Sequence, residues 1–511
     1  MILHRRSHRF AAALFGGALL AFAFPGAGID LLALVALAPI VAAVLRARSW
    51  GEAFLLGAAG YFVTWLINVP WVIPVMVRYG GLPMPVGISL YVLLALVVAM
   101  YGGLFAFLVW RYRRLPPPAI WILVPAAWAA VEFLRTFLLT GFPWNLLAVA
   151  LIDTPPLVIL ARVIGPYGVA FLAMIPATLL GWIAATPGVP KRKATAGVAA
   201  VALVAAWLGA GALILSRIDP SAGEPLDAAM LQPNITLEMR WDLRSAIRIY
   251  ELMMEMSREA AAERPGVVIW PESTVPLTFA VSPFYRESVE DFSLESGADV
   301  ILGSIAEDAA DPTQLWNAAY LVTEGEVKGR YDKVRLVPFG EYVPLRELLF
   351  FADELVRAVG DFQFGSSERP LVGRFAYGPA ICYEIVFPQI ATTQVRNGAT
   401  VLVTITNDAW FGETAAPRQH LDAARLRAIE TDRWLLRAAT TGISAAVDPA
   451  GRIVASLPVG ERGIVRAHAS ARQSTTPYVR FGDWFGWAAA IAAALAAVIG
   501  RIPERLRRNH G

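Results

Sequence analysis

The sequence contains a single cysteine, Cys382, among 511 residues. No disulfide can therefore form within the chain, and no site with several cysteine ligands can hold a metal. Histidine is also scarce, and the five histidines include no HExxH motif, so a zinc site is not expected. Only 17% of the residues are charged and 57% are hydrophobic, whereas soluble proteins are nearer a quarter charged. This composition excludes a disordered chain and argues against an ordinary soluble enzyme.

Acidic residues are nearly absent from the first part of the chain. Residues 1–215 hold four acidic and fourteen basic residues, whereas residues 216–482 hold 35 acidic and 26 basic residues. Such a difference within one chain indicates two environments. We expect a membrane domain over 1–215, a water-soluble domain over 216–482, and a last span with a tail over 483–511.

Long apolar runs predict the architecture of the membrane domain. A bilayer core about 30 Å thick is crossed by roughly 20 apolar residues in a helix. We expect about eight spans, the sixth interrupted at Gly165–Gly168, and we interpret the first as a retained helix rather than a signal peptide because further spans follow at once. The runs lie near residues 9–25, 30–45, 52–73, 86–110, 119–140, 157–186, 195–215 and 483–500.

The basic residues predict the orientation of these spans. If the N-terminus is cytoplasmic, the loops and termini on that side carry fifteen Lys and Arg, and the short loops on the other side carry only Arg78. We therefore expect a multi-pass protein of the bacterial inner membrane with both termini cytoplasmic and residues 216–482 in the periplasm. The basic clusters lie at the ends of apolar runs, so no nucleic-acid partner is expected.

Two charged residues, Glu132 and Arg135, lie inside the fifth expected span. Charges in a bilayer are costly, so these two should pair with each other or face a polar interior. They have two interpretations, a structural ion pair or a site that holds a lipid headgroup.

The soluble part alternates between strand-like and helix-like patterns, which predicts an α/β domain with its own core. Amphipathic helices are expected over 241–263, 284–296 and 417–434. The expected strands are Ala228–Gln232, Val267–Trp270, Val300–Ile305, Ala318–Val322, Tyr377–Cys382, Val401–Thr406 and Ile443–Val447.

Three residues near the ends of expected strands are candidates for catalysis, namely Glu272, Lys333 and Cys382. A nearby ammonium stabilises a thiolate, and a carboxylate can take the thiol proton and later pass it to a leaving group. Each residue alone also has a structural interpretation: Cys382 as a small buried hydrophobe, Lys333 in a surface pair with Asp332, and Glu272 as a helix cap. The residues alone indicate an enzyme domain of undetermined class.

The same segments resemble the motifs of the nitrilase, or carbon–nitrogen hydrolase, superfamily. Glu272 stands in WPES, Lys333 and Glu341 stand in YDKVRLVPFGEYVP, and Cys382 stands in ICYEIVFP. The fusion to about eight spans narrows the resemblance to the apolipoprotein N-acyltransferase family. Other similar stretches are EFLRTFLLTGFPWN, LQPNI, TNDAWFG and QHLDAARLRAIETDRWLLRAATTGISA.

The resemblance implies an αββα sandwich that performs acyl transfer in two steps. Cys382 would attack the sn-1 ester of a phospholipid, typically phosphatidylethanolamine, and form a thioester. The α-amino group of an S-diacylglyceryl cysteine at a lipoprotein N-terminus would then accept the acyl chain. Glu272 would act as general base and acid, and Lys333 would stabilise the thiolate and the oxyanion. This chemistry needs no metal or organic cofactor.

The resemblance also suggests supporting roles. Glu341 would orient Lys333 or share in proton transfer, and a backbone N–H near Tyr383 and Glu384 would complete an oxyanion hole. Trp241 is a candidate contact for the acceptor.

Two further segments, Val275–Phe284 and Leu345–Phe364, are candidate lids. Phe350 and Phe351, in the second, are candidates for lipid contact, although such apolar runs can also pack onto their own domain.

Two other functions use the same features. A membrane-anchored amidase or nitrilase would employ the same three catalytic residues with water as the acceptor, but the eight spans favour a lipid substrate. A transporter or receptor would need ionisable residues in several spans. In the expected spans of this chain, the clear ionisable residues are Glu132, Arg135 and Arg162. The sequence does not give the oligomeric state, and a monomer is the simplest expectation.

Overall fold

The computed structural model describes residues 3–188, 190–241, 243–343 and 361–499. The chain divides into two units. The first contains Met1–Ile73, Pro85–Arg217 and Asp483–Gly511, and the second contains Pro74–Met84 and Ile218–Gly482. Pro74–Met84, which includes the expected outer loop with Arg78, thus groups with the second unit.

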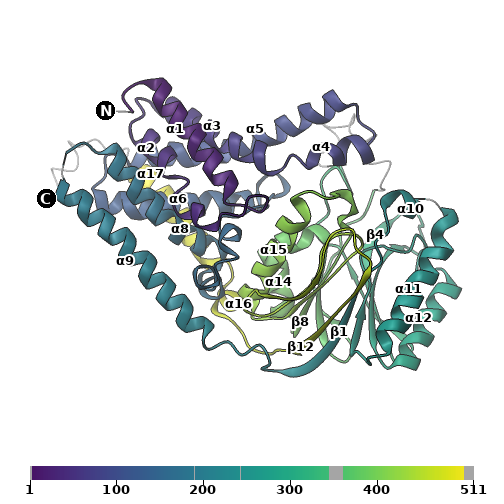
Figure 1. Cartoon of the computed structure of the whole chain (residues 1–511). Coiled ribbons are helices and arrows are strands. Elements are labelled where there is room, and N and C mark those ends of the chain that lie inside the picture. The colour runs from purple at the N-terminus through teal and green to yellow at the C-terminus, as the bar shows by residue number, and fades with distance from the viewer. Residues whose placement is uncertain (1–2, 189, 242, 344–360, 500–511) are drawn as a thin grey trace. The chain divides into compact units, whose positions relative to one another are not determined.

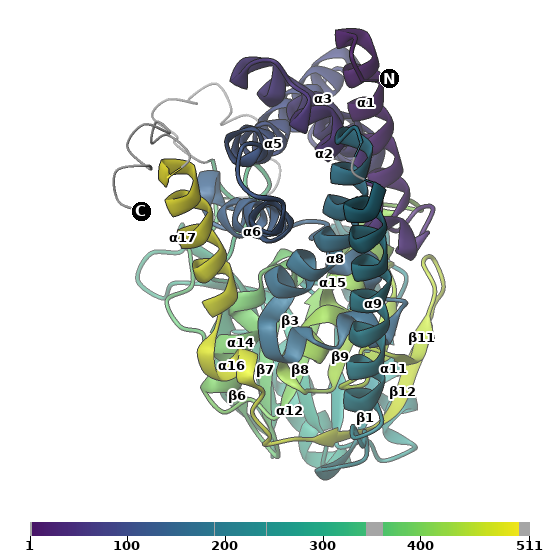
Figure 2. The same ribbon diagram turned by 90° about the vertical axis from the view of Figure 1, so that its left-hand side faces the viewer.

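The first unit is helical (Figures 1 and 2). Among the described residues, five helices of this unit, α3, α5, α6, α8 and α9, are long and apolar enough to cross a membrane, and Asp30–Leu45 and α17 are shorter apolar segments. Each of the eight predicted runs contains a described helix, while the number of crossings stays a prediction. The helices are α1 (Arg6–Phe22), α2 (Ala38–Leu45), α3 (Trp50–Asn68), α5 (Met84–Tyr112), α6 (Pro117–Arg135), α7 (Pro155–Val158), α8 (Ala161–Ala185), α9 (Pro190–Leu215) and α17 (Trp484–Ile499), with the short α4 at Val72–Pro74.

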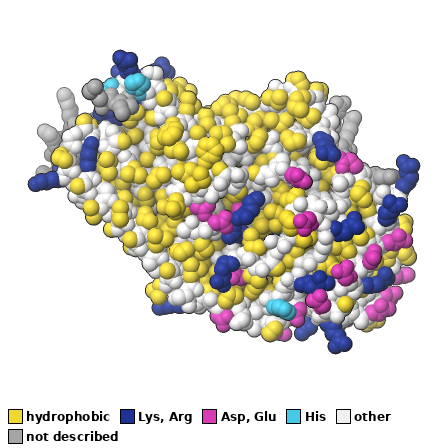
Figure 3. Space-filling view, viewed as in Figure 1, with side chains coloured by type: hydrophobic (Ala, Val, Ile, Leu, Met, Phe, Trp, Pro, Cys, Tyr) yellow, Lys and Arg dark blue, Asp and Glu magenta, His cyan; other side chains and the backbone are white. Residues whose placement is uncertain are grey.

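The outer faces of these helices are apolar. In Figure 3, hydrophobic side chains dominate the visible face of the helical unit, whereas charged side chains are spread over the second unit. Leu93 and Met100 on α5 and Val201 on α9 are all more than half exposed. Such an apolar surface is typical of a protein that contacts lipid. The predicted interruption of the sixth run is confirmed, because Gly165 inside α8 has a φ of 66°.

The second unit contains two six-stranded sheets, ordered β12-β1-β2-β3-β4-β5 and β11-β10-β9-β8-β7-β6. The strands are β1 (Glu224–Gln232), β2 (Val267–Ile269), β3 (Asp299–Glu307), β4 (Leu315–Thr323), β5 (Glu326–Asp332), β6 (Leu371–Val372), β7 (Ala376–Ile381), β8 (Val401–Thr406), β9 (Leu435–Ala439), β10 (Ser444–Val447), β11 (Ile453–Leu457) and β12 (Gly463–Ala471). The helices are α10 (Leu237–Trp241), α11 (Ala246–Ala261), α12 (Pro283–Ser296), α14 (Pro388–Arg396), α15 (Ala416–Thr431) and α16 (Pro477–Phe481).

The alternation of side chains along the strands produces four layers. Val267 and Ile269 of β2 lie in a core shared with Val403 of the other sheet, whereas Val268 faces a second core that contains residues of α11 and α12. On the other sheet, α14 contacts β7 and α15 contacts β9 (Figure 2). The two sheets therefore face each other with helices outside, which is the αββα sandwich that the resemblance implied.

All seven predicted strands and the three predicted helices are confirmed, with shifted ends. Five strands were not predicted, namely β5, β6, β9, β11 and β12. Strand β5 carries the charged residues Glu326, Lys328 and Arg330 on its solvent side. Strand β9 is buried on both faces, so apolar and polar side chains do not alternate along it. Neither pattern resembles a half-buried strand.

Candidate active site

The three catalytic candidates lie just beyond strands of both sheets. Glu272 follows β2 and Lys333 follows β5 in the first sheet, while Cys382 directly follows β7 in the second. Glu272, which is buried, and Lys333 both influence the charge state of Cys382. The face-to-face packing of the sheets thus brings together residues that are 61 and 49 positions apart in the sequence.

A buried charge cluster forms the centre of the site. Lys333 Nζ donates to Glu341 Oε1 at 2.9 Å and to Glu272 Oε1 at 3.3 Å. The amide of Asn317 on β4 donates to the same two oxygens, at 2.7 Å to Glu272 and 2.8 Å to Glu341. All four side chains are buried. One cation and one amide therefore hold two carboxylates side by side.

The second oxygen of each carboxylate is held by the backbone. Glu272 Oε2 accepts the N–H of Asn407 at 2.8 Å, and Glu341 Oε2 accepts the N–H of Val337 at 2.8 Å. Asn407 follows β8, so Glu272 is tied to the opposite sheet. Both carboxylates are consequently fixed in orientation before any substrate binds.

The charge states follow from burial and from these neighbours. Burial would lower the pKa of Lys333, but the carboxylates of Glu341 and Glu272 raise it above its usual value, so the ammonium is permanent. Burial and the Glu272 carboxylate raise the pKa of the Cys382 thiol, and Lys333 offsets this only in part. The resting Cys382 side chain is therefore a neutral thiol. Glu272 and Asp408 are the carboxylates that influence it, and Glu272 has the larger effect.

The backbone of Cys382 adopts an unusual conformation, with a φ of 52°. Its side chain is partly buried against the core between the sheets. A residue other than glycine at positive φ is strained and persists only where its surroundings enforce it. Strain at this position marks the residue as a functional candidate independently of its chemistry.

Glu384 links the cysteine loop to the lysine loop. Its carboxylate accepts the N–H of Ile381 at 2.7 Å and, on the other side, the N–H groups of Val334 at 2.6 Å and Arg335 at 3.1 Å. Burial raises the pKa of Glu384 to about 7, although these hydrogen bonds by themselves would lower it. The Glu384 carboxylate thus positions the backbone of both loops. The ring of the neighbouring Tyr383 packs edge-on against Phe387.

The predicted substrate contacts are only partly described. Trp241 ends α10 but its side chain, like Phe350 and Phe351, lies outside the described residues. In the first candidate lid, Phe279 is buried in the outer core, whereas Phe284 is 58% exposed. Part of this segment therefore packs onto its own domain, and its role as a lid stays a prediction.

Sequence reasoning assigned no role to Asn317 or to Asp408 and His420, which lie behind Cys382. Asn317 stands inside an apolar strand. An isolated amide in such a strand could have been recognised from the sequence as a candidate, because a buried polar group needs a hydrogen-bond partner. Asp408 and His420 fall in two of the stretches that carry the resemblance, but nothing in their spacing indicates that they meet.

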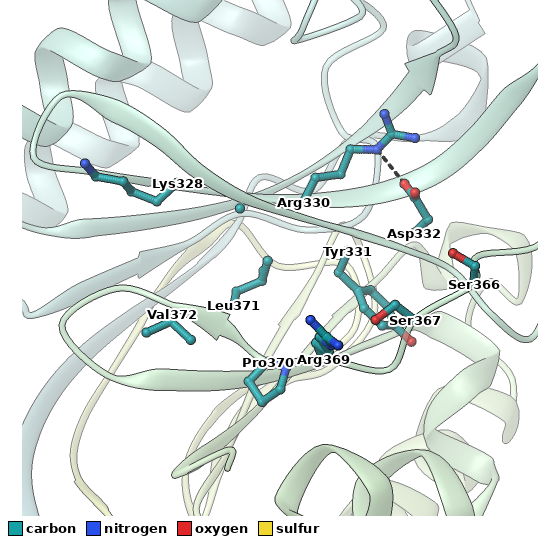
Figure 4. Close-up of a pocket in the computed structure, with 11 residues that line it drawn as sticks. Lys328, Arg330, Tyr331, Asp332, Ser366, Ser367, Arg369, Pro370, Leu371 and Val372 are labelled. Atoms are coloured by element: carbon teal, nitrogen blue, oxygen red, sulfur yellow. Dashed lines mark hydrogen bonds and ion pairs between the residues drawn. The ribbon is translucent and has the colours of Figure 1, made fainter. Parts of the chain in front are cut away.

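A separate cavity of about 220 Å³ lies between β5 and β6 (Figure 4). Its basic side chains include Lys328 and Arg330, which already pair with Glu326 and Asp332 at 2.5 and 2.6 Å. Two of its basic side chains are therefore already paired, and we assign no function to this cavity.

The charged pair in α6 stabilises an irregular segment of the helical unit. Arg135 Nη1 donates to the carbonyl oxygens of Phe142 at 2.9 Å and Trp144 at 2.7 Å, and Glu132 Oε1 accepts the N–H of Leu147 at 2.8 Å. Non-helical backbone at membrane depth must be satisfied by protein groups. This geometry favours the structural interpretation of the pair over a headgroup site.

Comparisons with known proteins cover almost the whole chain. Residues 16–179 match the family model described as the apolipoprotein N-acyltransferase N-terminal domain, and residues 227–476 match the carbon–nitrogen hydrolase family. An apolipoprotein N-acyltransferase from Geobacter metallireducens is 34% identical over 96% of this chain and 95% of its own length. One from Methylococcus capsulatus is 35% identical over 97% and 96%.

Among solved structures, the amidase from Nesterenkonia sp. AN1 has 19% identity and a TM-score of 0.39, over 50% of this chain and 96% of its own. The level of identity to the two acyltransferases, extending over both the helical unit and the sandwich, establishes the relationship. The chain belongs to the apolipoprotein N-acyltransferase family.

Proposed function

We propose that this enzyme transfers the sn-1 acyl chain of a phospholipid, phosphatidylethanolamine in the first instance, to the N-terminal S-diacylglyceryl cysteine of lipoproteins through a thioester on Cys382. The observation that carries the proposal is the buried pair of Glu272 and Lys333, which acts electrostatically on Cys382. Family membership supplies lipoprotein N-acylation, and the phospholipid donor and the thioester are the proposed steps.

In the first step, Glu272 takes the proton of the Cys382 thiol while Sγ attacks the ester carbonyl carbon. The carbonyl oxygen becomes an oxyanion that the fixed ammonium of Lys333 stabilises. The carbon–oxygen bond to glycerol then breaks, the lysophospholipid oxygen takes the proton from Glu272, and the acyl chain stays on sulfur. A neutral resting thiol suits this scheme, because deprotonation then accompanies attack.

In the second step, the acceptor's free α-amine attacks the thioester carbonyl. Glu272 removes a proton from the amine, and collapse of the tetrahedral intermediate forms the amide and expels the Cys382 thiolate. The proton on Glu272 then returns to sulfur, which restores the resting state. Lys333 keeps its charge throughout, since the two carboxylates stabilise its protonated form.

We further propose that the membrane domain at 1–215, the catalytic domain at 216–482 and the last span and tail at 483–511 are arranged with both termini in the cytoplasm and the catalytic domain in the periplasm. The basic residues at the ends of the apolar runs support this orientation. A cysteine introduced at the exposed Glu259 of a Cys382→Ser chain should react with a membrane-impermeant maleimide added to spheroplasts. One introduced at the exposed Thr195 should not, and the reverse pattern would overturn the orientation.

The catalytic proposal is tested with purified protein in detergent and phosphatidylethanolamine labelled in its sn-1 chain. We expect a labelled acyl adduct on Cys382, detected by mass spectrometry and removed by hydroxylamine. Adding a diacylglyceryl-cysteine peptide should move the label to the peptide amine. Cys382→Ser is the control for adduct position. A folded wild-type protein without adduct would refute the thioester, and label released only as free fatty acid would favour a hydrolase.

A further inference from the structure

A buried polar network that takes no part in the acyl-transfer steps lies behind the nucleophile. His420 of α15 places Nε2 3.0 Å from the carbonyl oxygen of Cys382 and Nδ1 3.1 Å from Asp408 Oδ1. Arg437 of β9 donates from Nη2 to Asp408 Oδ2 at 2.7 Å and lies 3.1 Å from His420 Nδ1. His420, Asp408 and Arg437 are each at most 1% exposed. Three separate elements thus meet behind Cys382.

The direction of the key hydrogen bond follows from its acceptor. A carbonyl oxygen only accepts, so His420 Nε2 carries a proton in either charge state of the ring. On the other side of the ring, Nδ1 donates to Asp408 Oδ1 when it carries a proton and accepts from Arg437 Nη2 when it does not, so it has a partner in either charge state. Asp408 Oδ1 also accepts the Thr406 hydroxyl at 2.8 Å. Burial raises the pKa of Asp408, but Arg437 and His420 outweigh it and lower the pKa, so the carboxylate stays ionised. The imidazole is consequently fixed in orientation.

The backbone conformation of Cys382 is unfavourable and needs hydrogen bonds from its neighbours to hold it. Its φ of 52° is unfavourable for a side chain with a Cβ. On its N-terminal side, Glu384 holds the N–H of Ile381 at 2.7 Å. On its C-terminal side, His420 holds the carbonyl of Cys382 itself. The nucleophile therefore has a hydrogen bond on each side of its strained backbone.

We propose that His420 is a positioning residue for the nucleophile: the bond from its Nε2 to the Cys382 carbonyl fixes the peptide between Cys382 and Tyr383, and Asp408 and Arg437 fix the imidazole. This inference rests on the proposed acyl transfer from Cys382. Because the peptide is planar, fixing its carbonyl also fixes the direction of the Tyr383 N–H, the backbone donor that we expect to face the oxyanion. Both ring nitrogens of His420 are engaged in this network, so it acts through Cys382 and not on substrate.

The two amide substitutions at His420 separate this role from general packing. In His420→Gln the side-chain nitrogen reaches the place of Nε2 and can still donate to the Cys382 carbonyl. In His420→Asn the nitrogen reaches only the place of Nδ1, so the contact with Asp408 is kept and the bond to Cys382 is lost. We expect acyl-enzyme formation within about fivefold of wild type for His420→Gln and about 100-fold slower for His420→Asn, in line with the cost of a misplaced reacting group.

Alkylation of Cys382 by iodoacetamide gives a second readout that does not depend on lipid. It should show the same order, with His420→Asn slower than His420→Gln over the whole pH profile. The matched control is His468, which pairs with Asp227 at 2.5 Å but is exposed, and whose Gln and Asn variants should both equal wild type. Equal rates for the two His420 variants, whether both normal or both impaired, would overturn the proposal.

The two proposals fail in different ways. If wild type forms no thioester, the proposed function is refuted, while the alkylation rates still decide the role of His420. If His420→Asn does not fold, Asp408→Asn loosens the imidazole without removing it. Asp408→Asn also removes a negative charge that raises the pKa of the Cys382 thiol, so alkylation is compared per thiolate, from the full pH profile. The rate per thiolate should fall about tenfold, and a wild-type value for that folded variant would overturn the positioning role.

Discussion

Replacing Gly303 with alanine should impair catalysis through the backbone of Glu272. Gly303 lies on β3, and a Cβ built there would be 2.6 Å from the nitrogen of Ser273, 2.7 Å from Glu272 Cα and 2.9 Å from the oxygen of Pro271. Ordinary contacts of a Cβ are 3.4–4 Å. The segment that carries Glu272, the proposed general base, must therefore move by about 0.5–1 Å, because all three contacts are with backbone.

The expected effect is large on chemistry and moderate on stability. A displacement near 1 Å of a reacting group costs about 100-fold in rate, so acyl-enzyme formation should fall by about that factor in Gly303→Ala. Overpacking typically lowers the free energy of unfolding by about 1–3 kcal/mol. The assay is the single-turnover rate of label transfer from phosphatidylethanolamine to Cys382, with thermal unfolding measured in parallel.

Gly329→Ala is the matched control on the neighbouring part of the same sheet. A Cβ at Gly329 would meet only the end of the Leu371 side chain, at 3.0 Å, which can move away. This variant should keep a rate within a few-fold of wild type. If folded Gly303→Ala also keeps a rate within threefold, the backbone position of Glu272 does not limit the reaction and the reasoning is wrong.

Three further predictions concern individual charges. Glu272→Gln should abolish acyl transfer. Because it removes a carboxylate that, together with burial, raises the pKa of the Cys382 thiol, it should lower that pKa and make alkylation at pH 8 faster; a slower rate would contradict the charge assignment. Because burial raises the pKa of Glu384 to about 7, its proton stabilises the fold below pH 4.5, and this contribution is lost as the pH rises through 7. Glu384→Gln should remove that pH dependence from the melting temperature, and an unchanged profile would argue against it. Glu132→Gln weakens the acceptor for the Leu147 N–H, so the melting temperature in detergent should fall while thioester chemistry in the folded fraction stays normal.

The local sequence was a good guide to the elements that carry the site. The apolar strands β2, β7 and β8 and the polar residues that follow them were visible as runs and breaks in the sequence. Strand β5 was not, although it leads directly to Lys333, because its solvent face is charged. Lys333 was found from its motif rather than from its place in the fold.

The partners of the candidate residues could not be found in this way. Asn317 holds both Glu272 and Glu341, and Asn407 ties Glu272 to the opposite sheet. The sequence separations of these pairs carry no periodic signal. A backbone N–H near Tyr383 and Glu384 in an oxyanion hole stays a prediction. Nothing in the sequence indicated that the Glu384 carboxylate accepts backbone N–H groups from both loops.

Composition and charge are enough to predict two parts in two environments, since they report directly whether a segment can be solvated by lipid or by water. The side-chain pattern likewise predicts most of the secondary structure of the sandwich, because burial on one face leaves a period of two in a strand. That Glu272, Lys333 and Cys382 share one site, and that His420 supports the last of them, is visible only in the folded chain. Those contacts arise from strand order and from the packing of two sheets, which depend on the whole chain at once and leave no local pattern.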